Sequence, residues 1–225
     1  MHIQRHFDKD LDEIKELLLR MGGMVEEQIQ QAVRALLDRD TTIAENVIAN
    51  DDAVDQMEVR IDQAVIELIA KMQPAAVDLR FVATAMKITP ELERIADLAQ
   101  DVCERVIELA REPQIKQFAQ LPLLAENAQR MVREALDSFV RHDAELARKV
   151  IRDDDIVDQL TVDSFRTLLT YMLEDPRNIS PAIRLTFIGK YFERMADGAT
   201  NICEMVVYLV EGKMIKHVHE ANRAG

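Results

Sequence analysis

The chain has 225 residues, a formal net charge of −13 and 48% apolar residues. This length suits one large domain or two small domains with cores of their own. The negative charge argues against direct binding to DNA or RNA, which calls for a basic surface. No run of about 18 apolar residues occurs, so we expect no membrane-spanning helix. The N-terminus has no apolar signal core, so we expect no secretion signal.

The first half of the chain predicts three helices. Only six Gly and six Pro interrupt the whole sequence, which favours long helices over many short strands. Apolar residues recur at helical spacing from about 8 to 38, and a second helix is predicted over about 41–72. Pro74 ends the connection that follows, and the third helix is predicted to continue to about 111, before Pro113.

The second half predicts three more helices, over about 114–141, 143–174 and 180–211. Ser180 and Pro181 suit the N-cap and the first position of the last helix. Because the links between neighbouring amphipathic helices are short, we expect antiparallel packing.

The two halves also repeat each other in sequence. One acidic motif recurs with a shift of 103 positions (154 − 51), as Asp51-Asp52-Ala53-Val54-Asp55-Gln56 and Asp154-Asp155-Ile156-Val157-Asp158-Gln159. A second recurs with a shift of 100 (193 − 93), as Glu93-Arg94-Ile95-Ala96-Asp97 and Glu193-Arg194-Met195-Ala196-Asp197. The period is too long for a solenoid unit and indicates two fused copies. We therefore predict an all-α fold of two tandem, pseudo-symmetric three-helix bundles with six long helices. The predicted parts are a first repeat, 1–112, a second repeat, 113–212, and a polar C-terminal tail, 213–225.

Each half holds two pairs of carboxylates spaced i,i+4. On a helix this spacing places both side chains on one face, one turn apart. Like charges held that close repel each other unless a cation lies between them. Pairs from neighbouring antiparallel helices could together bind a hard cation, and Mg²⁺, Mn²⁺, Ca²⁺, Fe and Zn ions are all candidates. The predicted metal ligands are Asp51, Asp55, Glu93 and Asp97 in the first half and Asp154, Asp158, Glu193 and Asp197 in the second.

The acidic motifs do not resemble a redox or catalytic site. Their carboxylates follow a stripe different from the apolar one, so we expect them near the bundle surface. None of the five His residues falls inside a motif, whereas ferritin-like di-iron sites use Glu-x-x-His pairs that face the core. Arg94 and Arg194 lie between the members of the pairs, and we interpret them as local charge compensation.

Several further motifs accompany the duplicated acidic segments, namely Met21-Gly22-Gly23-Met24-Val25-Glu26, Asp78-Leu79-Arg80 and Tyr171-Met172-Leu173-Glu174-Asp175. In this combination, over roughly 7–212, the chain closely resembles the PhoU family of bacterial phosphate-signalling accessory proteins. The resemblance implies multinuclear metal clusters held by the same eight carboxylates on the bundle surface. The family commonly has Gly where Ala96 and Ala196 stand, and often has His where Gly198 stands.

The resemblance also implies a function. Family members are not enzymes but cytoplasmic negative regulators of the phosphate-starvation response that limit phosphate uptake. The implied partners are the ATPase subunit of the phosphate ABC transporter, the PAS domain of a membrane histidine kinase, and a second copy of the chain. Neither insertion into the membrane nor nucleic-acid binding is implied. From the residues alone, two alternatives stay open: a carboxylate-bridged metal-storage protein or metalloenzyme, and a helical adaptor without functional metal.

Overall fold

The computed structural model describes residues 2–50, 52–72, 76–115 and 120–215, and within these ranges it contains helices and no strand. A short 3-10 helix, η1 (Pro176–Asn178), joins the last two long helices. Asp51 and residues 216–225 of the predicted tail lie outside the described residues. The long elements are α1 (His2–Asp38), α2 (Thr41–Ala49), α3 (Asp52–Met72), α4 (Ala76–Leu109), α5 (Gln120–Arg141), α6 (Ala144–Glu174) and α7 (Ile179–Glu211).

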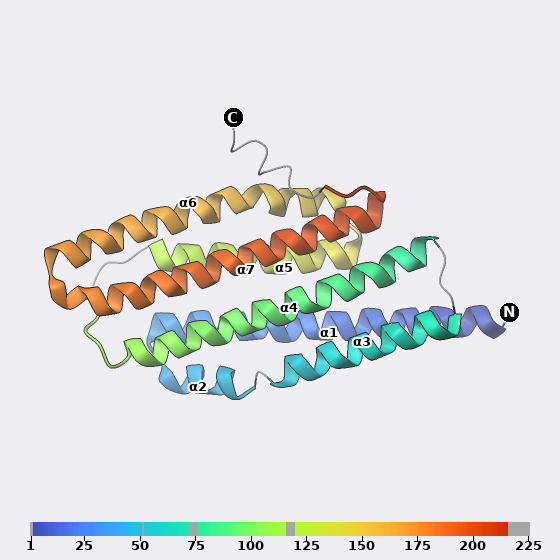
Figure 1. Ribbon diagram of the computed structural model, residues 1–225, viewed down its shortest axis with the longest axis horizontal. Coiled ribbons are helices and arrows are strands. Elements are labelled where there is room, and N and C mark those ends of the chain that lie inside the picture. The colour runs from blue at the N-terminus through green and yellow to red at the C-terminus, as the bar shows by residue number, and fades with distance from the viewer. Residues whose placement is uncertain (1, 51, 73–75, 116–119, 216–225) are drawn as a thin grey trace.

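The helices form two bundles that lie against each other. Helices α1 to α4 pack together in the first bundle, and α5, α6 and α7 in the second. The bundles meet along α4 and α7, and α1 also contacts α5. In Figure 1, α4 and α7 run side by side through the middle of an elongated molecule, with α3 and α6 on opposite outer sides. The predicted all-α fold of two three-helix bundles is confirmed.

Equivalent apolar stripes on α4 and α7 contribute to one continuous core that spans both bundles. Phe192 on α7 is fully buried, and the rings of Phe81 and Phe139 stack with centroids 6.0 Å apart across the two halves. Cys103 and Cys203, at equivalent positions, are both buried free thiols. No helix in the described part of the chain is both long and apolar enough to cross a membrane. The stripe residues, all buried, are Ile88, Leu92, Ile95, Ala99, Val102 and Val106 on α4 and Ile188, Phe192, Met195, Ala199, Ile202 and Val206 on α7.

The repeat extends to how the second helix of each bundle begins. Asp40 caps α2 by accepting hydrogen bonds from the backbone N–H of Thr42 (2.9 Å) and Ile43 (3.2 Å). Asp143 caps α6 in the same way, and each cap follows a residue with a left-handed backbone, Arg39 (φ 53°) or His142 (φ 52°). Each aspartate satisfies N–H groups that have no partner within the helix, which fixes where the helix starts.

The continuous second helix predicted over 41–72 is wrong, because the helix ends at Ala49 and a new one begins at Asp52. The side-chain amide of Asn50 donates to the carbonyl oxygen of Asn46 (2.8 Å), and its backbone N–H bonds to Val47. A short polar side chain that bonds the backbone competes with the helical hydrogen bonds. At the equivalent position of the second half Asp153 instead pairs with Arg130 (2.7 Å), and α6 continues unbroken.

Three other predicted helix starts were wrong. Helix α1 begins at His2 rather than near 8. Helix α7 begins at Ile179, because Asp175 caps the preceding 3-10 turn by accepting from the backbone N–H of Arg177 (3.0 Å). Ser180 is therefore inside the helix, where its hydroxyl donates to Glu112 (2.9 Å). Helix α5 begins at Gln120 rather than near 114, since Pro113 and the two residues that follow it are not helical.

Candidate metal centre

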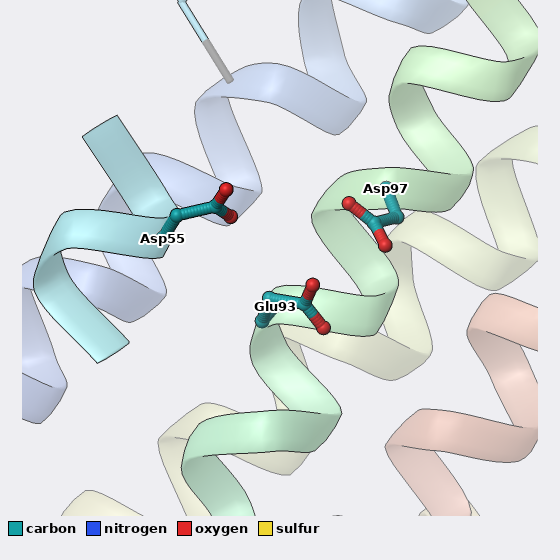
Figure 2. A group of neighbouring side chains, drawn as sticks. All are labelled: Asp55, Glu93 and Asp97. Atoms are coloured by element: carbon teal, nitrogen blue, oxygen red, sulfur yellow. The ribbon is translucent and has the colours of Figure 1, made fainter. Parts of the chain in front are cut away.

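Three carboxylates converge between α3 and α4 in the first bundle. Asp55 comes from the first turn of α3, and Glu93 and Asp97 come from successive turns of α4. Their neighbours Val54 and Leu92 are fully buried, which anchors each helix in the core and turns the acidic side chains outward. One carboxylate oxygen of each residue lies within 4.8 Å of the others, and Figure 2 shows the three groups facing a common space.

The charges at this cluster repel one another. Burial, followed by the charges of Asp97 and Glu58, raises the pKa of Glu93 from 4.5 to about 7. Burial also raises the pKa of Asp97, and the charge of Asp55 adds to the rise. Protonated Glu93 donates a hydrogen bond to Asp97, so a proton partly relieves the repulsion. Among the described residues, no Lys or Arg nitrogen lies within 4.0 Å of Asp55, Glu93 or Asp97.

Glu58 is an acidic neighbour that the sequence reasoning missed. Burial, followed by the charges of Asp62, Asp55 and Asp97, raises its pKa. Its spacing of three residues from Asp55 would have placed it on the same side of α3. The repeat gave no signal for it, because the equivalent position in the second half is Thr161.

The donor set fits a hard cation. Carboxylate oxygens from two helices are the ligands that Mg²⁺, Mn²⁺ and Ca²⁺ prefer, and iron also accepts them. A cation between the three groups would relieve the repulsion that raises the pKa of Glu93. The group contains no His, and Glu93 is half-buried while Asp55 and Asp97 are exposed. As predicted, these acids lie on the outer side of the bundle.

The second half brings its acids together less closely. Burial, followed by the charges of Glu193 and Asp158, raises the pKa of Asp197. No three of them approach as closely as the first-half group within the described ranges. Glu193 forms an ion pair with Lys190. Asp154 lies one turn before Asp158 on α6 and is half-buried.

Arg94 and Arg194, which we interpreted as local charge compensation, also act on acids of the opposite half. The positive charge of Arg94 on α4 opposes the burial-driven rise in the pKa of Asp197 on α7. The charge of Arg194 on α7 likewise opposes the burial-driven rise in the pKa of Asp101 on α4. Because α4 and α7 are in contact, charged side chains of one bundle affect the pKa values of carboxyl groups in the other.

Gly198 lies where α7 approaches α4 closely. A Cβ atom at this position would be 3.0 Å from both Cγ1 and Cδ1 of Ile95. Glycine thus permits a contact between the bundles that a larger residue would disturb. With Gly198 in place of His, this position adds no donor atom to the carboxylates of the second half.

Comparison with known proteins identifies relatives along nearly the whole chain. The family model described as the PhoU domain matches residues 18–106 and 121–206. The phosphate-specific transport system accessory protein PhoU homolog of Aquifex aeolicus is 43% identical over 211 residues, 94% of this chain and 96% of that protein. The accessory protein PhoU of Escherichia coli is 38% identical over 217 residues, 96% of this chain and 90% of that one. The crystal structure of PhoU from Pseudomonas aeruginosa matches with a TM-score of 0.89 and 41% identity, covering 92% of this chain and all of that one (100%).

Proposed function

Because this chain belongs to the PhoU family, we propose that it is a cytoplasmic negative regulator of the phosphate-starvation response that limits phosphate uptake. Its relatives are named as accessory proteins of the phosphate-specific transport system, which supports an association with transport machinery. The proposed partners are the ATPase subunit of the phosphate ABC transporter and the PAS domain of a membrane histidine kinase, and the proposed oligomer is a homodimer. The proposal makes the chain a linker and not an enzyme.

An exposed apolar stripe on α6 supports a role in binding other proteins. Val162, Phe165, Leu169 and Leu173 are 45%, 48%, 43% and 79% exposed. Their spacing of three or four residues places them on one face of the helix. A contiguous apolar surface of this kind is typical of a protein interaction site. We propose this face of α6 as a contact for one of the two partners.

We further propose that the acidic clusters bind metal ions. The convergence of Asp55, Glu93 and Asp97 within 4.8 Å is the observation that carries this part. In the first half these three groups would hold the cation together with Asp51, and in the second half the ligands would be Asp154, Asp158, Glu193 and Asp197. A bound cation would neutralise the facing charges of the two helices. The ligands of the first half would then tie α3 to α4 at the surface of the bundle.

Affinity capture tests the linker role. The tagged chain, captured from phosphate-replete cells, should recover both the transporter ATPase and the sensor kinase. A double variant, Phe165→Ser with Leu169→Ser, should lose one of them, whereas Leu19→Ser, an equally exposed site (47%) on α1, should lose neither. Recovery of neither protein by the unchanged chain would overturn the linker proposal. Expression in a strain without its own PhoU should restore repression of a phosphate-starvation reporter.

Metal analysis tests the ligand assignment. The double variant Glu93→Ala with Asp97→Ala removes two of the three converging carboxylates, so the first half should lose its metal. Elemental analysis of the purified protein measures this loss, and circular dichroism checks that the helices are retained. An unchanged metal content in the first half would refute these ligands. Turnover in an oxidase assay would instead favour a carboxylate-bridged metalloenzyme.

A further inference from the structure

The two halves carry different residues three positions before the glutamate of each acidic cluster. Helices α4 and α7 match with a shift of 100 residues, so Glu93 corresponds to Glu193. Three residues before them, α4 has Pro90 and α7 has Lys190. At a spacing of i,i+3 on a helix, a lysine can reach the glutamate, whereas proline supplies no charge.

Lys190 contacts Glu193 in this way. Its Nζ forms an ion pair with Oε2 of Glu193, whose side chain is only 19% exposed, while the Lys190 side chain is 57% exposed. Glu193 is one of the proposed metal ligands of the second half. The ammonium group of Lys190 therefore competes with a metal ion for the carboxylate of Glu193.

The first cluster has no such ion pair. In the described residues, no Lys or Arg nitrogen lies within 4.0 Å of Asp55, Glu93 or Asp97, whereas Lys190 pairs with Glu193 in the second half. The two halves therefore differ in the positive charge that this chain places at its acids.

We propose that Lys190 is an internal counter-ion that occupies the second acidic cluster, so that the two halves bind divalent cations with unequal affinity. The inference rests on the proposed metal binding. The first half, with Pro90 at the equivalent position, takes a divalent ion from solution to relieve its repulsion. In the second half the ion must displace Lys190 from Glu193 and remain close to a positive charge. Lys190 is therefore a residue that sets metal affinity without being a ligand.

Single-site backgrounds make the two affinities separately measurable with Mn²⁺ as the probe. Glu93→Gln with Asp97→Asn leaves only the second cluster intact, and Glu193→Gln with Asp197→Asn leaves only the first. Calorimetric titration should show tighter Mn²⁺ binding in the background that keeps the first cluster. Adding Lys190→Gln to the background that keeps the second cluster should tighten binding about tenfold, because a like charge near the ion is removed. The same change should not alter binding by the first cluster.

Other substitutions at this position separate charge from packing. Lys190→Arg keeps a positive charge and should keep the weak affinity of the second cluster. Circular dichroism checks that each variant retains its helices. If Lys190→Gln leaves the second affinity unchanged, or if both clusters of the unchanged chain bind Mn²⁺ equally, the inference is wrong while metal binding stands. If neither cluster binds Mn²⁺, the metal proposal and the inference fall together.

Discussion

Replacing Glu93 with glutamine should stabilise the metal-free protein at neutral and higher pH. The pKa of this carboxyl is raised from 4.5 to about 7 by burial and by the neighbouring acids. Below about pH 4.5 the carboxyl is protonated in both folded and unfolded chains and costs no stability. As the pH rises to about 7, the unfolded chain releases the proton more readily, so the folded state loses stability. Glutamine, similar in shape and without charge, removes this loss.

The size of the effect follows from the shift. At about 1.4 kcal/mol per pKa unit, a rise from 4.5 to about 7 corresponds to roughly 3 kcal/mol for a group shielded from solvent. Glu93 is only half-buried, and solvent screening reduces this to about 1 kcal/mol. In a chain of this length, about 1 kcal/mol raises the melting temperature by about 2–4 °C. Thermal unfolding in EDTA, followed by circular dichroism, should show this rise at about pH 8 and none at about pH 4.

A matched control comes from the second half. Glu193→Gln removes a carboxylate that is paired with Lys190, so it should not raise the melting temperature at any pH. With Mn²⁺ added, the unchanged chain should melt at a higher temperature than Glu93→Gln, because only the unchanged chain gains the free energy of binding at the complete first site. Equal shifts for Glu93→Gln at both pH values, or no rise at the higher pH, would refute the reasoning.

Four further predictions concern packing, capping and reactivity. Phe192→Ala should lower the free energy of unfolding by about 3–5 kcal/mol in denaturant titration, since the ring is fully buried. Gly198→Leu should cost about 1–3 kcal/mol, and adding Ile95→Ala should recover part of it, because these residues meet between α4 and α7. Asp143→Ala should cost about 1 kcal/mol through the lost cap of α6, with little change in helix content by circular dichroism. Cys203, whose pKa burial raises to about 12, should react with a thiol reagent only after unfolding, as mass spectrometry would show.

Local sequence patterns predicted most of the helices correctly. Apolar spacing located the stripes on α4 and α7, because the positions that face a core follow from the helical period alone. The break between α2 and α3 was not predicted, because Asn50 and Asp153, at equivalent positions of the repeat, are both short polar residues with similar helix propensity. Only their partners distinguish them: Asn50 bonds its own backbone, whereas Asp153 pairs with Arg130 from another helix. Whether a polar side chain interrupts a helix depends on those partners.

The sequence by itself determined the duplicated bundles, the surface position of the acids and the pairing of Glu93 with Asp97, since a spacing of i,i+4 fixes distances within one helix. The tertiary structure alone decided which acids of α3 approach that pair, because the rotation of one helix against another depends on packing. It also decided that the charge of Arg94 on α4 acts on Asp197 of the opposite bundle, because α4 packs against α7. The pairing of Lys190 with Glu193 lies within one helix, so its i,i+3 spacing already permits it. Two clusters that share the same carboxylate motifs thereby differ in the charges around them.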